Sequence, residues 1–188
     1  MFEFDTGFWG VNQPDRVLKN SWQPPPPEWI KVNVDVCLKP MYKPSIGGVF
    51  RDHKGRFLLA FGFGRLHWDI YEVELLAVHS LSWFLQKWML EYKWITVEGD
   101  NVNVIKFLQG SPNKSNGGIV DNQLEDLTFL KDFNYVIFNH VNRDCNKLAD
   151  FCANTALSYN FIWGDFRLGS IPPFFLLLKE ECDAIGSL

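Results

Sequence analysis

The sequence predicts an α/β domain built on a mixed five-stranded sheet with helices on its faces. Three observations lead to this fold class. The first strand-like segment alternates apolar and polar residues, the next two form a hairpin, and the later strand-like segments are separated by segments with helical periodicity. Strands joined by tight turns pair antiparallel, whereas strands separated by helices are usually parallel. The predicted order is therefore β-β-β-α-β-α-α-β-α.

The first three strands are predicted within residues 28–64. The segment "EWIKVNVDV" has an apolar face and a polar face, which consist of Ile30, Val32 and Val34 and of Lys31, Asn33 and Asp35. The segment "IGGVFRDHKGRFLLAFGFG" contains two apolar runs around "DHKG", a turn that ends in glycine. Such a pattern is typical of a β-hairpin.

The remaining elements alternate between helix and strand. Helical periodicity predicts a helix over 71–90, a short helix over 101–110 that ends at Gly110, a helix over 119–130 and a helix over 144–159. The apolar segments "KWITVEG" and "NYVIFNHV" are predicted as strands between them.

The 188 residues are enough for one domain with tails, and they contain no internal repeat. Four consecutive prolines in "SWQPPPPEW" favour a stiff, extended connector. We therefore expect an N-terminal tail and linker over 1–28, the domain over 29–158 and a C-terminal extension over 159–188.

Composition restricts the location and the partners. The chain lacks a secretory signal and an apolar run of membrane-spanning length, and its four cysteines form no CxxC pair, so we expect reduced thiols and an intracellular protein, nuclear or cytoplasmic. A net charge of −4 argues against a purely electrostatic nucleic-acid binder. Residues 31–65 are nevertheless locally basic, which is compatible with a phosphate-bearing partner or, more plainly, with solvated hairpin turns.

Four acidic residues stand at the ends of elements or face the core. Asp35 lies on the polar face of the first strand, Glu74 in the first turn of the long helix, Asp100 after "ITVEG", and Asp150 in the last predicted helix. Each of these acids also fits an ordinary structural role. Asp100, for example, would serve as the N-cap of the following helix. Converging carboxylates repel one another unless cations lie between them, and oxygen ligands suit hard ions such as Mg²⁺ or Mn²⁺.

Five segments in order give the chain a family resemblance. They are "WIKVNVDV", "GGVFRDHKGRFLLAF", "VELLAV", "VEGDNVNVI" and "NHVNRDCNKLADFCANTA", which together cover roughly residues 29–158. The chain resembles the type 1 ribonuclease H domain, and in particular the ribonuclease H-like domains associated with plant non-LTR retroelements. The resemblance implies the ribonuclease H-like fold and a catalytic, metal-binding set formed by Asp35, Glu74, Asp100 and Asp150.

The resemblance also implies an activity and further site residues. The implied reaction is endonucleolytic hydrolysis of the RNA strand of an RNA–DNA hybrid by a monomer, with two Mg²⁺ ions roughly 4 Å apart, or Mn²⁺ in their place. His140 would assist proton transfer or product release. The substrate-binding positions would be Asn146, which in the family positions the last acid or the substrate, Arg143 and Asn101.

Departures from the family leave a second function open. The family commonly has glycine after the first acid, where this chain has Val36, and serine after the third, where it has Asn101. These changes are compatible with a catalytically silent domain that binds nucleic acid or protein, for instance through the aromatic residues after position 160. A doubly wound nucleotide-binding fold is excluded, because no glycine-rich loop joins a first strand to its helix.

Overall fold

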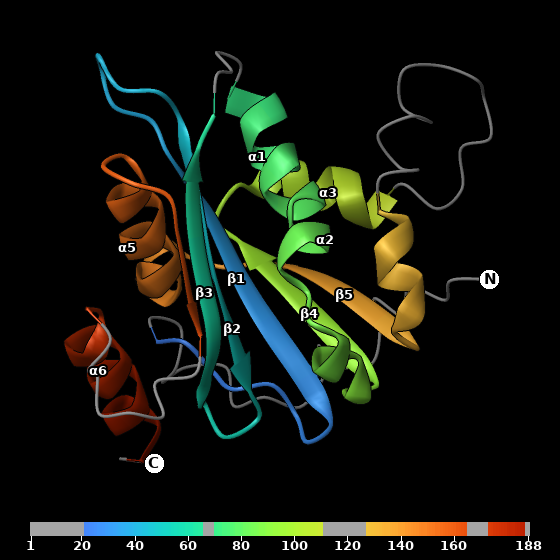
Figure 1. Cartoon of the computed structure of the whole chain (residues 1–188). Coiled ribbons are helices and arrows are strands. Elements are labelled where there is room, and N and C mark those ends of the chain that lie inside the picture. Colours follow the sequence, from blue (N-terminus) through green and yellow to red (C-terminus); the bar gives the residue numbers. More distant parts are fainter. Residues whose placement is uncertain (1–20, 66–69, 111–126, 165–172, 187–188) are drawn as a thin grey trace, which may run out of the picture.

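A computed structural model describes residues 21–65, 70–110, 127–164 and 173–186 (Figure 1). Within these residues, six strands form one sheet in the order β5-β4-β1-β2-β3-β6. The pairs β1–β2, β2–β3 and β3–β6 are antiparallel, and β1–β4 and β4–β5 are parallel. The strands are β1 (Trp29–Cys37), β2 (Ser45–Asp52), β3 (Phe57–Gly64), β4 (Trp94–Gly99), β5 (Tyr135–His140) and β6 (Phe161–Gly164). The predicted mixed sheet is confirmed.

The strand count of five is wrong by one. The additional strand, β6, pairs with β3 from Leu59↔Gly164 to Gly62↔Phe161 and forms an edge of the sheet. It has four residues and lies in what the sequence suggests is a tail. Such a short segment gives little periodicity, and its pairing depends on the free edge of β3, which the sequence alone does not reveal.

Some of the helices agree with the predicted ranges and others do not. They are α1 (Ile70–His79), α2 (Leu81–Phe84), α3 (Val102–Gly110), α5 (Lys147–Ala156) and α6 (Phe175–Gly186), with 3₁₀ turns η1 (Lys87–Glu91), η3 (Thr128–Asp132) and η4 (Arg143–Cys145). The single helix predicted over 71–90 is wrong. It is interrupted at buried Ser80, whose hydroxyl donates to the carbonyl of Ala77 at 2.9 Å. The predicted helix over 119–130 lies mostly outside the described residues.

Helices cover both faces of the sheet, as Figure 1 shows. Residues of α1 and α3 belong to the larger apolar cluster, together with Ile30, Val32 and Val34 of β1. Helix α5 packs on the opposite face and forms a second cluster with Phe161 and Phe174. No helix among the described residues is long and apolar enough to cross a bilayer.

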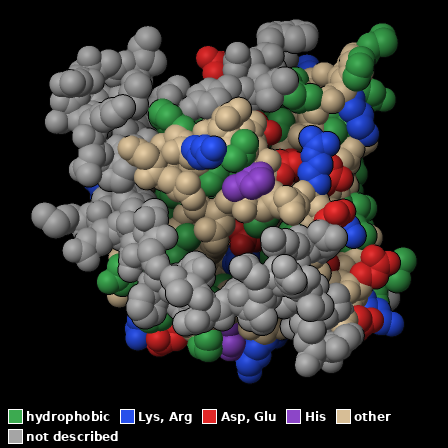
Figure 2. Space-filling model, turned by 180° about the vertical axis from the view of Figure 1, so that it is seen from behind, with side chains coloured by type: hydrophobic (Ala, Val, Ile, Leu, Met, Phe, Trp, Pro, Cys, Tyr) green, Lys and Arg blue, Asp and Glu red, His purple; other side chains and the backbone are tan. Residues whose placement is uncertain are grey.

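The polar face of β1 is buried rather than solvated. Lys31 is 7% exposed and pairs with Glu98 at 2.6 Å, and Arg51 of β2 is 1% exposed and pairs with Glu181 of α6. These two cations therefore do not contribute to a basic surface, contrary to the expectation of a locally basic region. On the face shown in Figure 2, the acidic and basic side chains of the described residues are interspersed, without a large patch of one sign.

Gly47 allows α5 to approach the sheet closely. A Cβ atom built on this residue would lie 2.1 Å from the backbone nitrogen of Ala153, far inside contact distance. Gly47 also lies directly opposite Asp35 in the β1–β2 ladder. The absence of a side chain at this position therefore sets the distance between α5, which carries Asp150, and the strand that carries Asp35.

We predict that Gly47→Ala lowers the free energy of unfolding by about 1–3 kcal/mol, because the helix backbone has to move away from the strand. Urea denaturation measures this change. Gly64→Ala is the matched control, since the nearest atom to its Cβ would be 4.0 Å away. Equal stability of the two variants would contradict the close-approach role of Gly47.

Candidate active site

Asp35 and Asp100 lie side by side at the carboxyl ends of two adjacent parallel strands. The register pairs Asn33 of β1 with Glu98 of β4, so Asp35 and Asp100 come two residues later on each chain segment. The Asp35 side chain is buried, and its Oδ1 accepts a hydrogen bond from the backbone N–H of Val36 at 2.9 Å. The ends of parallel strands thus bring two carboxylates together from positions 65 residues apart.

Two helices supply the other acids. Glu74 comes from α1 on one face of the sheet, and Asp150 from the first turn of α5 on the other. Asn154, one helical turn further along α5, donates to Asp150 Oδ1 at 3.1 Å and accepts from the Cys37 thiol at 3.4 Å. The sequence reasoning missed Asn154, although its i+4 spacing from Asp150 is a signal that could have identified it.

The four carboxylates interact electrostatically. Burial, followed by repulsion from Asp100, raises the pKa of Asp35 to about 8, with smaller contributions in the same direction from Asp150 and Glu74; the Val36 N–H opposes them. Burial and the charge of Asp100 raise the pKa of Glu74 to about 7, against a hydrogen bond from Asn101 and the charge of Arg143. All four acids identified from the sequence are therefore brought together in one electrostatic cluster, which we call the acid cluster.

Asn101, and not Asp100, caps the following helix. Asn101 Oδ1 accepts hydrogen bonds from the backbone N–H groups of Asn103 at 3.1 Å and Val104 at 3.3 Å. These are the donors that a helix start leaves without intrahelical partners. The capping role that the sequence suggests for Asp100 thus belongs to Asn101, and the carboxylate of Asp100 is available for another role.

His140 and Arg143 both contact Asp100. The His140 Nε2 atom lies 3.1 Å from the backbone carbonyl oxygen of Asp100, so the ring donates through this nitrogen. Arg143 Nε donates to Asp100 Oδ2 at 3.1 Å, while 93% of the arginine side chain is exposed. An arginine so exposed contributes little to stability and is free to leave the carboxylate.

Asn146 lies beneath the acid cluster rather than on its surface. It is 1% exposed, its Nδ2 donates to the carbonyl of Val34 at 3.0 Å, and its backbone carbonyl accepts the N–H of Asp150 at 3.0 Å. These bonds join the start of α5 to β1 next to Asp35. Of the two roles that the family resemblance implies for Asn146, its burial favours the positioning of Asp150.

Carboxylates in this arrangement suit a hard divalent cation. Oxygen ligands and an excess of negative charge match Mg²⁺ and Mn²⁺, and a bound cation would offset the burial and the repulsion that raise the pKa of Asp35. Among the described residues, however, no three histidine, cysteine or acidic side chains already stand close enough to hold a metal ion. The four carboxylates are suitable ligands for a divalent cation. Their side chains would have to move closer together to hold one.

Comparisons with known proteins place the chain in a family. The model of the family described as "Reverse transcriptase-like" matches residues 33–156, which is more than half of the chain. The chain belongs to this family, and residues 33–156 form a ribonuclease H-like domain. An Arabidopsis thaliana protein named "Putative ribonuclease H protein" is 30% identical over 95% of this chain. The chain spans 28% of the length of that relative.

Solved structures agree on the fold. Ribonuclease H1 from the archaeon Halobacterium salinarum is 20% identical, with a TM-score of 0.51 over 69% of this chain and 97% of its own. LC11 ribonuclease H1, isolated from compost by a metagenomic approach, is also 20% identical, with a TM-score of 0.51 over 69% of this chain and 96% of its own. At this identity the likeness shows the fold alone.

We predict that Asn101→Ala destabilises the protein by about 1 kcal/mol through loss of the helix cap, whereas Asp100→Asn does not. Chemical denaturation of both variants tests this. A larger loss of stability in Asp100→Asn than in Asn101→Ala would show that Asp100 is the cap.

We also predict that the metal-free chain loses stability as the pH rises from about 4 to about 8. The folded-state pKa values of Asp35 and Glu74 lie above their ordinary values, so between these limits the folded state binds more protons than the unfolded state, and raising the pH favours unfolding. The contribution of Asp35, whose pKa is about 8 in the folded chain against an ordinary value of 3.8, is on the order of 5 kcal/mol.

Denaturation curves of the wild-type chain and Asp35→Asn over this pH range, with chelator present, isolate that contribution. Asp35→Asn should match the wild type at acidic pH and exceed it in stability near pH 8, because asparagine does not ionise. A constant difference between the two proteins across the range would contradict the raised pKa of Asp35.

Proposed function

We propose that this chain is a ribonuclease that hydrolyses the RNA strand of RNA–DNA hybrids with Mg²⁺ as cofactor and Mn²⁺ as a possible substitute. The observation that carries the proposal is the acid cluster at the carboxyl ends of β1 and β4, in which burial and mutual repulsion raise the pKa of two acids. The structure of LC11 ribonuclease H1 in complex with an RNA/DNA hybrid, whose TM-score against this chain is 0.50, supports the substrate class.

In this proposal Asp35, Glu74, Asp100 and Asp150 hold the metal. When bound there, the metal would supply an activated water and stabilise the charge of the leaving oxygen. His140, whose ring bonds to the Asp100 carbonyl, would hold a proton for the leaving group. Arg143, which pairs with Asp100 while almost fully exposed, would exchange this carboxylate for a substrate phosphate when the metal binds.

Val36, which stands where the family commonly has glycine, is compatible with this function. The Val36 side chain packs against the larger apolar cluster, because neighbouring residues of a strand point to opposite faces. It therefore lies on the face opposite Asp35, and its backbone N–H still donates to the Asp35 carboxylate. The Val36 side chain therefore does not lie beside the Asp35 carboxylate.

One observation favours a second function, that of a catalytically silent domain that binds nucleic acid or protein. Among the residues that the structure describes, the acidic side chains do not lie close enough together to hold a metal ion. An aromatic tail as the binding surface is less well supported, because Phe161 and Phe174 are buried in the second apolar cluster. Activity measurements decide between the two functions.

We predict that the chain cleaves an end-labelled RNA–DNA hybrid with Mg²⁺ or Mn²⁺ and leaves duplex RNA and duplex DNA intact. Asp100→Asn should lower the rate at least about a hundredfold, because it removes a metal ligand and its charge. Glu180→Asn, a loss of an exposed acid on α6, is the control and should retain activity. Absence of hybrid cleavage by the folded wild-type chain with either metal would favour the silent domain.

A further inference from the structure

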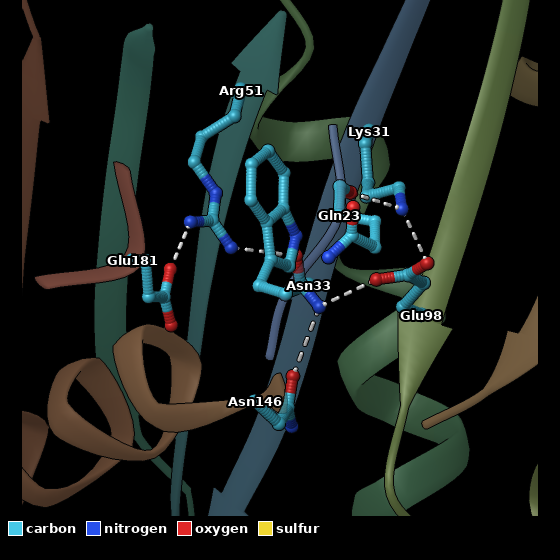
Figure 3. Close-up of polar contacts among 8 residues, drawn as sticks. Gln23, Lys31, Asn33, Arg51, Glu98, Asn146 and Glu181 are labelled. Carbon is cyan, nitrogen blue, oxygen red and sulfur yellow. Dashed lines mark hydrogen bonds and ion pairs between the residues drawn. The ribbon is translucent and has the colours of Figure 1, made fainter. Parts of the chain in front are cut away.

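A buried polar network crosses the sheet on the face covered by α5, as Figure 3 shows. Its centre is Asn33 of β1, which has no exposed surface and uses both ends of its amide. Its Oδ1 accepts from Trp22 Nε1 at 2.9 Å and from Arg51 Nη2 at 3.2 Å. Its Nδ2 donates to Glu98 Oε2 at 3.0 Å and to Asn146 Oδ1 at 3.2 Å.

Two of the residues that complete this network lie outside the matched family region of residues 33–156. Trp22 comes from the segment before the prolines, is 1% exposed, and its ring lies 3.4 Å from the guanidinium carbon of Arg51. Glu181 comes from α6 and forms the ion pair with Arg51. A fully buried guanidinium requires a counter-charge, and Glu181 supplies it.

The Nδ2 group of Asn33 connects the network to the acid cluster through Glu98 and Asn146. Glu98, one partner of the Asn33 amide, lies two residues before Asp100 on β4. Asn146, the other partner, bonds through its side chain to the carbonyl of Val34, next to Asp35, and through its backbone to the N–H of Asp150. One amide group therefore fixes the relative positions of the three segments that carry Asp35, Asp100 and Asp150.

We propose that Asn33 is a positioning residue for the acid cluster and that helix α6 acts on the cluster through Glu181, Arg51 and Asn33. The guanidinium holds the amide of Asn33 in the orientation in which its N–H groups face Glu98 and Asn146. If α6 leaves the sheet, Arg51 loses its counter-charge and Asn33 loses a fixed donor. The segments that carry the acids then lose their common support.

The catalytic consequence of this inference rests on the proposed function, so the test has a readout that does not need activity. In the full-length chain, Glu181→Gln keeps the shape of the side chain and removes the charge that pairs with Arg51. The control is Glu180→Gln, which removes the same charge from the exposed neighbour on the same helix. Backbone ¹H–¹⁵N spectra of the metal-free proteins report on the environment of each amide.

We expect Glu181→Gln to shift the amide signals of Asp100 and Asp150, and Glu180→Gln to leave both unchanged. Hybrid cleavage by Glu181→Gln should show a kcat lowered about tenfold with an unchanged KM, because an outer partner of the acids is altered and substrate contacts are not. If the wild-type chain cleaves no hybrid but the amide shifts occur, the positioning role holds and the proposed function fails.

A second variant covers the case in which Glu181→Gln does not fold. Replacing both partners, as Arg51→Met with Glu181→Met, leaves no buried charge unpaired and usually preserves stability. It still removes the hydrogen bond from Arg51 to Asn33, so the same signals should shift. Unchanged Asp100 and Asp150 signals in a folded variant, with shifts confined to the surroundings of α6, would overturn the inference.

Discussion

Repulsion among carboxylates is the constraint on which the rest of this structure depends. The fold places Asp35 and Asp100 at the ends of neighbouring parallel strands and adds Glu74 and Asp150 from opposite faces of the sheet. Burial, together with this repulsion, raises the pKa values of Asp35 and Glu74, which is the electrostatic cost of the arrangement. A fold keeps such a cluster only if other interactions hold the segments together.

Two features on the α5 face of the sheet provide that support. The missing side chain at Gly47 lets the backbone of α5 approach the strand, and the buried amide of Asn33 links β1, β4 and the start of α5. Both features lie next to the acids and neither is itself charged. Close packing and the hydrogen bonds of a neutral amide thus hold the acidic segments in place without adding a further charge.

The sequence was sufficient for the fold class and for the positions of the acids, because both depend on local patterns. Alternation in "WIKVNVDV" predicts β1, and the acids stand at the ends of predicted elements or at core-facing positions within them. The sequence was not sufficient for contacts between distant segments. The burial of Lys31 and Arg51 depends on Glu98 and Glu181, and the pairing of β6 depends on the open edge of β3. The catalytic and metal-binding roles of the acids stay predictions.

The most direct test of the account is to follow the side-chain carboxyl ¹³C signals of Asp35 and Glu74 over a pH titration, with and without Mg²⁺. The account predicts that Asp35 titrates near pH 8 in the metal-free chain, and that Mg²⁺ lowers its apparent pKa by several units because the cation offsets burial and repulsion. An Asp35 that titrates in the same range with and without Mg²⁺ would contradict the claim that the acid cluster is a metal site.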